Sequence, residues 1–437
     1  DVLPHKLLAT RPFKPGQRRG QVGELYRHEL TRKKGGLSIR QLIDEYTDAI
    51  KVLTPCVLAS PASVAQYLAP GVIDFDLVIF DEASQVPVSD AIGAMGRGKA
   101  VVIVGDSKQM PPTSFFSSSG TSSDDDQPDP DTAVDMESIL SEAVASGLHR
   151  IWLSWHYRSQ DEQLIAFSNR FYYEGRLASF PAPGHSGYRM GVSWQKVEGG
   201  IFLAGDQRTN RKEAEAIVAE VQRRAIDPID RDRSIGVVAF NLNQADLIRE
   251  LLEEAASGDS ALADLLEDES EEGLFVKNLE SVQGDERDVI LISVTYAKNQ
   301  QGRLPMNFGP LNRIGGERRW NVLVTRAKQE VVVFSSIEPE DIKLERVNSM
   351  AKGVHHMREY MLLARDGIEG EGGRKIKKCT GRDQHRHQIA EHLRQAGFVV
   401  EEDIGLSSFK IDLSLALPEE PERKLVAVLL DGPEYAK

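Results

Sequence analysis

The chain has 437 residues, of which 41% are hydrophobic and 27% charged, with a formal net charge of −14 at pH 7. The composition is ordinary for a soluble globular protein of about two to four domains. No apolar run approaches the roughly 18 residues of a membrane helix, so we expect no membrane contact. The acidic balance argues against a surface that binds nucleic acid throughout, but it permits a local basic channel. The two distant cysteines favour a reducing cytoplasm over a disulfide framework.

The first predicted elements occupy residues 38–67. Residues 1–37 are basic and suit a solvated connector. Ser38 and Gln41 predict a capping box ahead of a helix to residue 53. Cys56–Ala59 predicts a strand, and Ser60-Pro61 predicts the N-cap and first turn of another helix. A helix N-terminus suits a phosphate, so Ser60 and Ser63 fit equally a plain cap or a phosphate contact.

Two buried strands that end in polar residues carry the strongest chemical signal. Leu77–Phe80 is a short apolar run that ends in Asp81 and Glu82. Open α/β sheets bind ligands at the carboxyl ends of their strands. In a nucleotide-hydrolysing site one acid would hold Mg²⁺ and the next would orient or deprotonate the attacking water. The alternative is a strand end with two solvated acids.

The second strand, residues 100–104, ends in Gly105-Asp-Ser-Lys-Gln-Met-Pro-Pro112. Gly105 permits a sharp turn, and Gln109 is placed to reach a phosphate from the neighbouring strand. With Asp81-Glu-Ala-Ser-Gln85, this segment resembles superfamily-one helicases of the type that includes the nonsense-mediated decay helicase. Their motifs read Asp-Glu-Ala-x-Gln and Gly-Asp-x-x-Gln-Leu-Pro-Pro, and Met110 is a volume-conserving replacement of the leucine.

The resemblance implies two RecA-like P-loop domains that use ATP and Mg²⁺. It assigns Mg²⁺ to Asp81, the attacking water to Glu82 and γ-phosphate sensing to Gln109. It also places three further residues at the nucleotide: Gln85, Gly105 and Asp106. In such helicases a Ser/Thr-rich turn touches the nucleic-acid backbone, which corresponds here to Ser60 and Ser63.

Later segments continue the resemblance. Residues 115–135 have the composition of a disordered loop. Leu153-Ser-Trp-His-Tyr-Arg-Ser-Gln160 resembles the motif that opens the second RecA-like domain, whose arginine reaches the γ-phosphate. Arg158 therefore takes that role by resemblance, and a guanidinium suits it because it stays charged and forks onto phosphate oxygens.

The middle of the second domain combines predicted elements with possible nucleic-acid contacts. Asn210 and Glu213 predict a capping box for the helix 210–221, and a buried strand covers residues 235–240. Asn241 and Gln244 then fit equally a polar helix start or a nucleic-acid contact. The acidic residues 250–272 predict a solvated insertion.

The last two helicase-like motifs lie at residues 276–293 and 318–328. The first resembles Val-x-Ser-x-Gln-Gly-x-Glu-x-Asp, with Glu280 where Asp is common. The resemblance places Gly284 and Glu286 toward the nucleotide. The second resembles Arg-Leu-Asn-Val-Ala-Leu-Thr-Arg-Ala, with Arg326 as a second cation for the γ-phosphate and Arg319 in support. The family pattern places three residues toward nucleic acid: Ser281, Gln283 and Thr325.

The C-terminal residues predict a helix, 384–395, followed by strands at 398–404, 408–416 and 424–430. This order resembles the endonuclease fold of very-short-patch repair enzymes, with Asp412 and Asp431 as metal ligands. The family's Glu-Cys-Asp-Gly-x-x-Tyr-His is altered here, because Leu429-Leu430 replace Glu-Cys and Ala436 replaces His. An inactive relic therefore fits as well as a nuclease.

No Gly-x-x-x-x-Gly-Lys-[Ser/Thr] loop occurs, and residues 93–100 lack its spacing and its hydroxyl. Because the downstream motif residues are kept, and because the chain does not begin with Met, we expect a piece of a longer protein rather than a lost ATPase. The expected α/β fold has an incomplete first RecA-like domain (1–145), a second (146–340), a linker (341–381) and a partial restriction-endonuclease-like domain (382–437).

The expected activity is that of an ATP-dependent helicase or translocase. It would act on single-stranded nucleic acid in the cytoplasm, with DNA favoured over RNA, and this piece alone would be inactive. The alternatives are a non-catalytic nucleic-acid-binding module on a degenerate ATPase and a helicase-associated endonuclease.

Overall fold

The structure is a computed structural model that describes residue 29 and residues 35–114, 134–135, 137–182, 189–205, 207–367 and 381–431. These residues form two compact units. Unit 1 holds the described residues up to Arg150 except Lys108–Met110, and unit 2 holds Lys108–Met110 and the described residues from Ile151 onward. No helix in these ranges combines the length and the apolar character needed to span a membrane.

Unit 1 is built on two parallel strands, β1 (Phe75–Phe80) and β2 (Gly98–Ile103), paired from Phe75↔Gly98 to Phe80↔Ile103. Its helices are α3 (Ile39–Glu45), α4 (Thr47–Leu53), α5 (Pro61–Tyr67), α6 (Val88–Met95) and α7 (Ile139–Ala145), with the 3₁₀ turn η2 (Ala83–Gln85) after β1. Short strands β3 (Thr113–Ser114) and β4 (Val134–Asp135) pair antiparallel. The core is small, formed by Phe80, Ala91 and Ile139 with their neighbours.

Three features of unit 1 differ from the sequence predictions. Strands β1 and β2, predicted to be buried, leave Leu77, Ile79 and Val102 exposed. The helix expected to residue 53 is divided into α3 and α4 at Tyr46, whose side chain is buried beside Ala49. Residues 56–59, expected as a strand, are exposed and pair with no strand in the described part of the chain. A short apolar run becomes a strand only where a neighbouring strand accepts its hydrogen bonds. The Ser38–Gln41 capping box and the Ser60 cap are confirmed.

Unit 2 contains a five-stranded parallel sheet in the order β5-β9-β8-β6-β7. Its strands are β5 (Gly191–Lys196), β6 (Ile235–Ala239), β7 (Phe275–Asn278), β8 (Arg287–Ser293) and β9 (Ala327–Ser335). The middle strands β6 and β8 are buried on both faces, which explains their continuous apolar runs. These strands confirm the predicted buried strands of the second domain.

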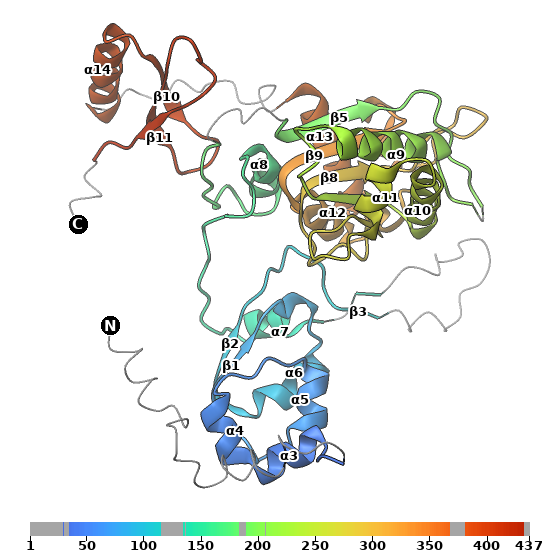
Figure 1. The fold of residues 1–437 in the computed structure, drawn as a ribbon, viewed down its shortest axis with the longest axis vertical. Helices are drawn as coiled ribbons and strands as arrows, with labels where there is room; N and C mark the ends of the chain where they lie inside the picture. Colours follow the sequence, from blue (N-terminus) through green and yellow to red (C-terminus); the bar gives the residue numbers. More distant parts are fainter. Residues whose placement is uncertain are drawn as a thin grey trace. The chain divides into compact units, whose positions relative to one another are not determined.

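Helices cover both faces of this sheet (Figure 1). One core cluster joins the sheet to α9 (Arg211–Ile226), α10 (Leu242–Ala256) and α11 (Ser260–Glu267). The other joins it to α8 (Gln163–Phe171), α12 (Gly316–Val324) and α13 (Lys352–Asp366). Three short 3₁₀ helices complete this part: η3 (Gly309–Asn312), η4 (Pro339–Asp341) and η5 (Leu344–Arg346). The arrangement is a doubly covered parallel sheet.

Two polar segments are more ordered than the sequence predicted. The expected linker 341–381 contains η5 and helix α13, which buries Met357, Tyr360 and Met361 in the core of unit 2. The expected acidic insertion 250–272 contains the end of α10 and all of α11, with Leu252 and Leu262 buried. In both segments charged residues lie on the solvent side of amphipathic helices.

The C-terminal module consists of helix α14 (Gly381–Gln395) and an antiparallel sheet of β10 (Val399–Ile404), β11 (Ile411–Ala416) and β12 (Val426–Val428). Its small core contains Ala390, Val400, Leu413 and Leu415. These elements follow the order that the sequence predicted. Figure 1 shows the module at the red end of the chain.

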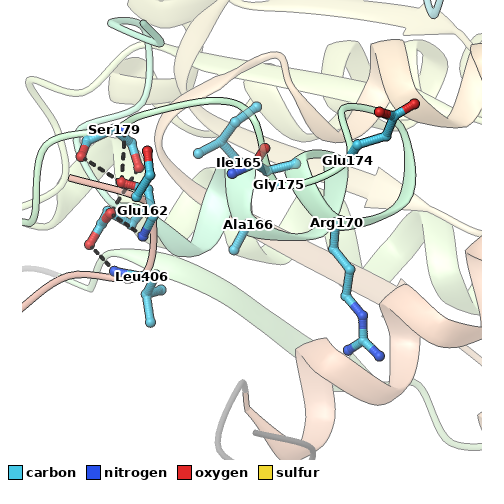
Figure 2. A pocket seen from close by; sticks show the side chains of 11 residues that line it. Glu162, Ile165, Ala166, Arg170, Glu174, Gly175, Ser179 and Leu406 are labelled. Carbon is cyan, nitrogen blue, oxygen red and sulfur yellow. Dashed lines mark hydrogen bonds between the residues drawn. The ribbon is translucent and has the colours of Figure 1, made fainter. Parts of the chain in front are cut away.

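The loop between β10 and β11 contacts the segment of unit 2 around α8. The Glu162 carboxylate, 5% exposed, accepts hydrogen bonds from Ser179 Oγ (2.8 Å), Leu406 N (2.8 Å) and Ser407 N (3.2 Å). Figure 2 shows Glu162 with Ser179 and Leu406 beside a cavity of about 470 Å³. A stacked pair, Trp155 and Phe180, also contacts Phe409 of the module. The module is thus attached by a buried carboxylate and by aromatic packing.

Candidate functional site

The end of β1 presents Asp81 and Glu82 at the surface of unit 1. The strand ends are held together, because Val104 N donates to Phe80 O (2.8 Å) and Ala83 N donates to Val104 O (2.9 Å). Glu82 has a left-handed backbone (φ 49°), and its N–H donates to Asp81 Oδ1 (3.0 Å). Such a conformation is uncommon for a residue other than glycine and is typical of functional turns. Within the described residues neither carboxylate forms an ion pair, so both remain available to a cation.

Gly105 fits the turn after β2 because a side chain there would make tight contacts with the backbone of η2. A Cβ atom there would lie 3.0 Å from Ser84 N and 3.1 Å from Ala83 N, in the backbone of η2. The close approach keeps η2 against the end of β2 and so fixes the residues that follow Glu82. Asp106 is next in the chain and is partly buried, while Gln85 ends η2 with an exposed side chain. The predicted residues of the two strand ends are therefore neighbours in unit 1.

Gln109 lies in the segment that packs with unit 2. Lys108 O accepts a hydrogen bond from Asn321 Nδ2 (3.0 Å), and Met110 is 4% exposed in the core of unit 2. The predicted boundary, which assigned residues 1–145 to the first domain, did not anticipate this. The replacement of leucine by Met110 keeps an apolar anchor for the segment.

Three further predicted residues, Arg158, Glu286 and Thr325, lie close together at the amino ends of the central strands β8 and β9. Arg158 Nε donates to Glu286 Oε2 (2.6 Å), and Arg158 Nη1 donates to Thr325 O (3.3 Å). The hydrogen bond from Arg158 lowers the pKa of Glu286, so this carboxylate is charged. Lys328 Nζ lies 3.6 Å from Glu286 Oε1. Residues 158, 286 and 325, far apart in the sequence, form one polar cluster at the amino end of these parallel strands.

Arg326 is 2% exposed and belongs to the same cluster. Its Nε donates to Val322 O (2.9 Å) and its Nη2 donates to Thr325 Oγ1 (3.1 Å), so it binds the last turn of α12. A cation at a helix C-terminus is favourable because the last carbonyl groups lack helical partners. In this structure Arg326 and Thr325 therefore cap a helix.

His156 joins the cluster, although the sequence motif did not single it out. Burial lowers its pKa to about 4, and the charges of Arg158 and Arg326 add to this shift. The imidazole is therefore neutral at pH 7, and its Nε2 accepts a hydrogen bond from Ser159 N (3.1 Å). The only sequence signal was its place two residues before Arg158. Its neutrality keeps a third positive charge away from the two arginines.

The loop 278–286 before β8 is fixed by its own side chains. Ser281 Oγ donates to Asn278 Oδ1 (2.8 Å), and Lys277 pairs with Asp285 (2.6 Å). Gly284 has φ 93°, a conformation that disfavours any side chain. The Gln283 amide is buried with no hydrogen-bond partner for its oxygen or nitrogen among the described residues. An unsatisfied buried polar group costs about 1–3 kcal/mol, so it is a sign of a missing ligand or water.

Two other residues of the motifs at 276–293 and 318–328, Glu280 and Arg319, have a structural role. Arg319 and Glu280 form a buried ion pair (2.7 Å) that joins α12 to the loop before β8. Glu280, where related helicases often have Asp, therefore reaches a partner on another element. Arg319 fixes the position of α12 through this pair, and its predicted support of the γ-phosphate contact stays a prediction.

The predicted nucleic-acid residues at helix starts act as caps. Asn241 Oδ1 accepts from Gln244 N (2.9 Å), and Ser60 Oγ accepts from Ser63 N (3.1 Å). Gln244 is fully buried, with its side chain bonded to Asn210 and Ser293. The structure therefore gives Gln244 a structural role in place of the predicted contact.

The Glu213 capping box is also corrected. Asn210 caps α9, but the Glu213 carboxylate accepts hydrogen bonds from Thr295 N (2.5 Å), Ser293 Oγ (2.7 Å) and Ser336 Oγ (3.1 Å). Burial raises the pKa of Glu213 to about 7, although these hydrogen bonds oppose the shift. Glu213 therefore links α9 to the carboxyl ends of β8 and β9.

The acids of the C-terminal module do not form a metal cluster in the described residues. Asp412, 4% exposed in β11, accepts a hydrogen bond from Leu430 N (2.9 Å). Asp431 is exposed at the end of the following strand. Across the described ranges no three His, Cys, Asp or Glu side chains gather as a metal site. Asp412 therefore serves to bind the chain after β12.

The fold defines the class of protein: a mixed α/β chain with parallel sheets, consistent with RecA-like domains. Two family models, each described as an AAA domain, match residues 23–117 and 136–338. The chain is 32% identical over 305 residues to the uncharacterized ATP-dependent helicase MG140 of Mycoplasma genitalium, and 31% identical over 303 residues to the uncharacterized homolog of MG140 in Mycoplasma pneumoniae. The chain is thus similar to ATP-dependent helicases, and AAA-domain models match two parts of it.

A more distant relative is the DNA replication ATP-dependent helicase/nuclease DNA2 of Gallus gallus, at 23% identity over 348 residues. The three alignments cover 68%, 68% and 77% of this chain and 26%, 26% and 29% of the relatives. The chain therefore spans about a quarter of the length of the curated relatives it matches.

Two solved structures also resemble parts of the chain. The PRRSV helicase is 13% identical, with a TM-score of 0.28, and the similarity covers 62% of this chain and 37% of that one. The C-terminal domain of a possible DNA helicase from a Lactobacillus is 14% identical, with a TM-score of 0.25, and covers 45% of this chain and 96% of that one.

Proposed function

We propose that this chain is part of an ATP-dependent helicase motor, which couples ATP hydrolysis to movement along single-stranded nucleic acid. The observation that carries the proposal is the cluster of Arg158, Arg326 and Glu286, three residues that the helicase motifs single out and that lie at the amino ends of β8 and β9. The relatives named as ATP-dependent helicases support the same activity. DNA is favoured over RNA as the substrate, in agreement with the DNA replication enzyme among the relatives.

The residues present fit a magnesium nucleotide. Asp81 offers an exposed carboxylate, a hard oxygen ligand of the kind that Mg²⁺ binds. Glu82 follows it, in position to orient or deprotonate a water. Bound Mg²⁺-ATP supplies the phosphoanhydride that is hydrolysed. Gln109, Arg158 and Arg326 would bind the γ-phosphate and stabilise the charge that develops on it.

The other predicted contacts keep their roles within this proposal. Around the nucleotide these are Gln85, Gly105, Asp106 and Gly284. Toward nucleic acid they are Ser60, Ser63, Asn241, Ser281 and Gln283, whereas the hydroxyl of the buried Thr325 donates to carbonyl groups of α12. The exposed free thiol of Cys56 is compatible with a reducing cytoplasm. The proposed metal-binding roles of Asp412 and Asp431 rest on the resemblance to the endonuclease fold alone.

The test is Glu82→Gln in the full-length gene product, assayed for ATP hydrolysis stimulated by single-stranded DNA. Loss of a general base or water-orienting acid is expected to lower kcat about 10²–10⁴-fold. The matched control is Glu142→Gln, an exposed glutamate on α7 of the same unit, which should leave kcat unchanged. Unchanged turnover in Glu82→Gln would contradict the assignment. A wild-type protein that binds the strand but does not hydrolyse ATP would favour a non-catalytic nucleic-acid-binding module.

A further inference from the structure

A basic groove lies at the carboxyl ends of β8 and β9. The cluster of Arg158, Arg326 and Glu286, here called the arginine cluster, lies at the amino ends of the same strands. The groove is lined by the loop 298–306, which follows β8, and by residues 341–346, which follow β9. Its volume is about 660 Å³. The carboxyl ends of parallel strands are the usual place for a ligand in an open α/β sheet. The groove therefore occupies a favourable position in the fold.

The lining of this groove is positively charged in a strongly acidic chain. It includes four cations and one acid, which gives a formal charge of +4 − 1 = +3, whereas the whole chain carries −14. The charged residues are Lys298, Arg303, Lys343, Arg346 and Asp341. A hollow surface of one sign concentrates the opposite charge from solution.

The single acid does not neutralise the arginines. Asp341 Oδ1 pairs with Lys298 Nζ (2.8 Å), and Asp341 Oδ2 accepts a hydrogen bond from Glu338 N (3.1 Å). Arg303 and Arg346 are exposed, and neither guanidinium has a hydrogen bond or ion pair with any residue that the structure describes. Two fork-shaped donors thus face solvent without an acceptor.

The loop that carries Arg303 is held in one conformation. Asn299 Oδ1 accepts hydrogen bonds from Gln301 N and Arg303 N (3.0 Å each), and Asn299 N donates to Arg303 O (2.8 Å). Asn312 Nδ2 donates to Met306 O (2.7 Å), which fixes the other end of the loop. A preformed loop loses little conformational entropy when a ligand binds.

We propose that this groove binds the phosphates of single-stranded nucleic acid. The inference rests on the proposed helicase function and adds a contact region that the sequence motifs do not include. Guanidinium groups bind phosphate oxygens in a forked geometry. The lining contains no aromatic side chain on which bases would stack, so the contact is made through the sugar-phosphate backbone and is independent of sequence. Leu304 and Met306 provide an apolar floor for the sugars.

The experiment measures salt-dependent binding of a fluorescein-labelled oligo-dT by the full-length gene product. Each phosphate contact to a single strand contributes about 0.7 to the slope of log K against log salt. The double variant Arg303→Ala/Arg346→Ala should therefore lower the magnitude of this slope by about 1.4, while kcat at saturating DNA stays unchanged. The control Arg231→Ala/Arg423→Ala removes the same charge from two other exposed arginines and should keep the wild-type slope.

The outcomes separate this inference from the proposed function. If the wild-type protein binds oligo-dT and the groove variant keeps its slope, the groove inference alone is refuted. If the wild-type protein does not bind any strand, the proposed function fails. An equal change in both double variants would indicate a general charge effect and would also refute the groove. The variant Arg303→Lys/Arg346→Lys keeps the charges and should retain the slope, which excludes misfolding as the cause.

Discussion

Arg158 provides a sharp test because its structural and catalytic contributions differ greatly in size. In the structure it pairs with Glu286, and the two side chains are 33% and 41% exposed. Ion pairs with this exposure contribute about 0–1 kcal/mol to folding, because solvent screens them. Arg158→Ala should therefore change the free energy of unfolding by no more than about 1 kcal/mol.

The expected effect on catalysis is much larger. An arginine that stabilises the γ-phosphate is worth about 10³–10⁵ in kcat, or roughly 4–7 kcal/mol in activation free energy. Arg158→Lys should not restore the rate, because an ammonium group lacks the planar fork of a guanidinium. The measurement is steady-state ATP hydrolysis at saturating single-stranded DNA, together with the thermal midpoint of each variant.

The matched control is Arg365→Ala, which removes a partly exposed arginine on α13 that is paired with Glu340 and Asp366. It removes the same charge and several ion pairs, but it should leave kcat unchanged. A kcat within about threefold of wild type for Arg158→Ala would refute the reasoning. So would a large loss of rate that is matched by a loss of folded protein.

Three further outcomes follow from buried contacts. Burial raises the pKa of the Glu213 carboxyl from its ordinary 4.5 to about 7. The protonated form therefore contributes stability that is complete below about pH 4.5 and is lost as the pH rises through 7. Glu213→Gln should remove up to about 3 kcal/mol of this pH dependence, measured by urea unfolding at pH 5 and pH 8. Glu162→Ala leaves two amides and a hydroxyl without their acceptor and should expose the loop around Leu406 to proteolysis, whereas retained protection would contradict its anchoring role. Gly105→Ala should destabilise unit 1 by about 1–3 kcal/mol, because its Cβ meets backbone atoms of η2, and an unchanged melting midpoint would show that the turn can move.

Sequence reasoning succeeded best for the central strands of unit 2, whereas the apolar runs of β1 and β2 are partly exposed in unit 1. Strand β6 reads Ile-Gly-Val-Val-Ala and the centre of β8 reads Val-Ile-Leu-Ile, and a parallel sheet covered on both faces buries such apolar segments. The contact of Arg158 with Glu286 was harder to predict from the sequence, because the two residues are 128 positions apart. Motif resemblance placed both at the nucleotide, but no local pattern states that they touch.

The predictions were wrong for segments in which many charged residues accompany an apolar pattern of helical spacing. Helix α13 buries Val354, Met357, Tyr360, Met361 and Ala364, a spacing of three and four residues that was present in the sequence. The glycine-rich segment that follows α13 favoured the prediction of a linker. Composition averages the two faces of an amphipathic helix, whereas periodicity separates them, so composition fails first in charged segments.

Polar residues at helix starts form a harder class. Gln244 has the residue type expected of a nucleic-acid contact, yet it is buried against Asn210 and Ser293. A cap and a ligand contact both require a short polar side chain next to free backbone N–H groups. The sequence therefore leaves the two roles equal, and only burial decides between them.

The two proposed sites of unit 2 are connected by the same two strands. Glu286 precedes β8 and Arg326 precedes β9, while Arg303 and Arg346 lie beyond the opposite ends of these strands. At about 3.3 Å per residue, the seven residues of β8 span roughly 23 Å, and the strand is hydrogen-bonded to neighbours on both sides. A buried parallel sheet does not bend under small forces, because its interior is close-packed. If ATP binds at Arg158 and Arg326 and nucleic acid binds in the basic groove, as proposed, a displacement at the first site would reach the second as a movement of the whole sheet.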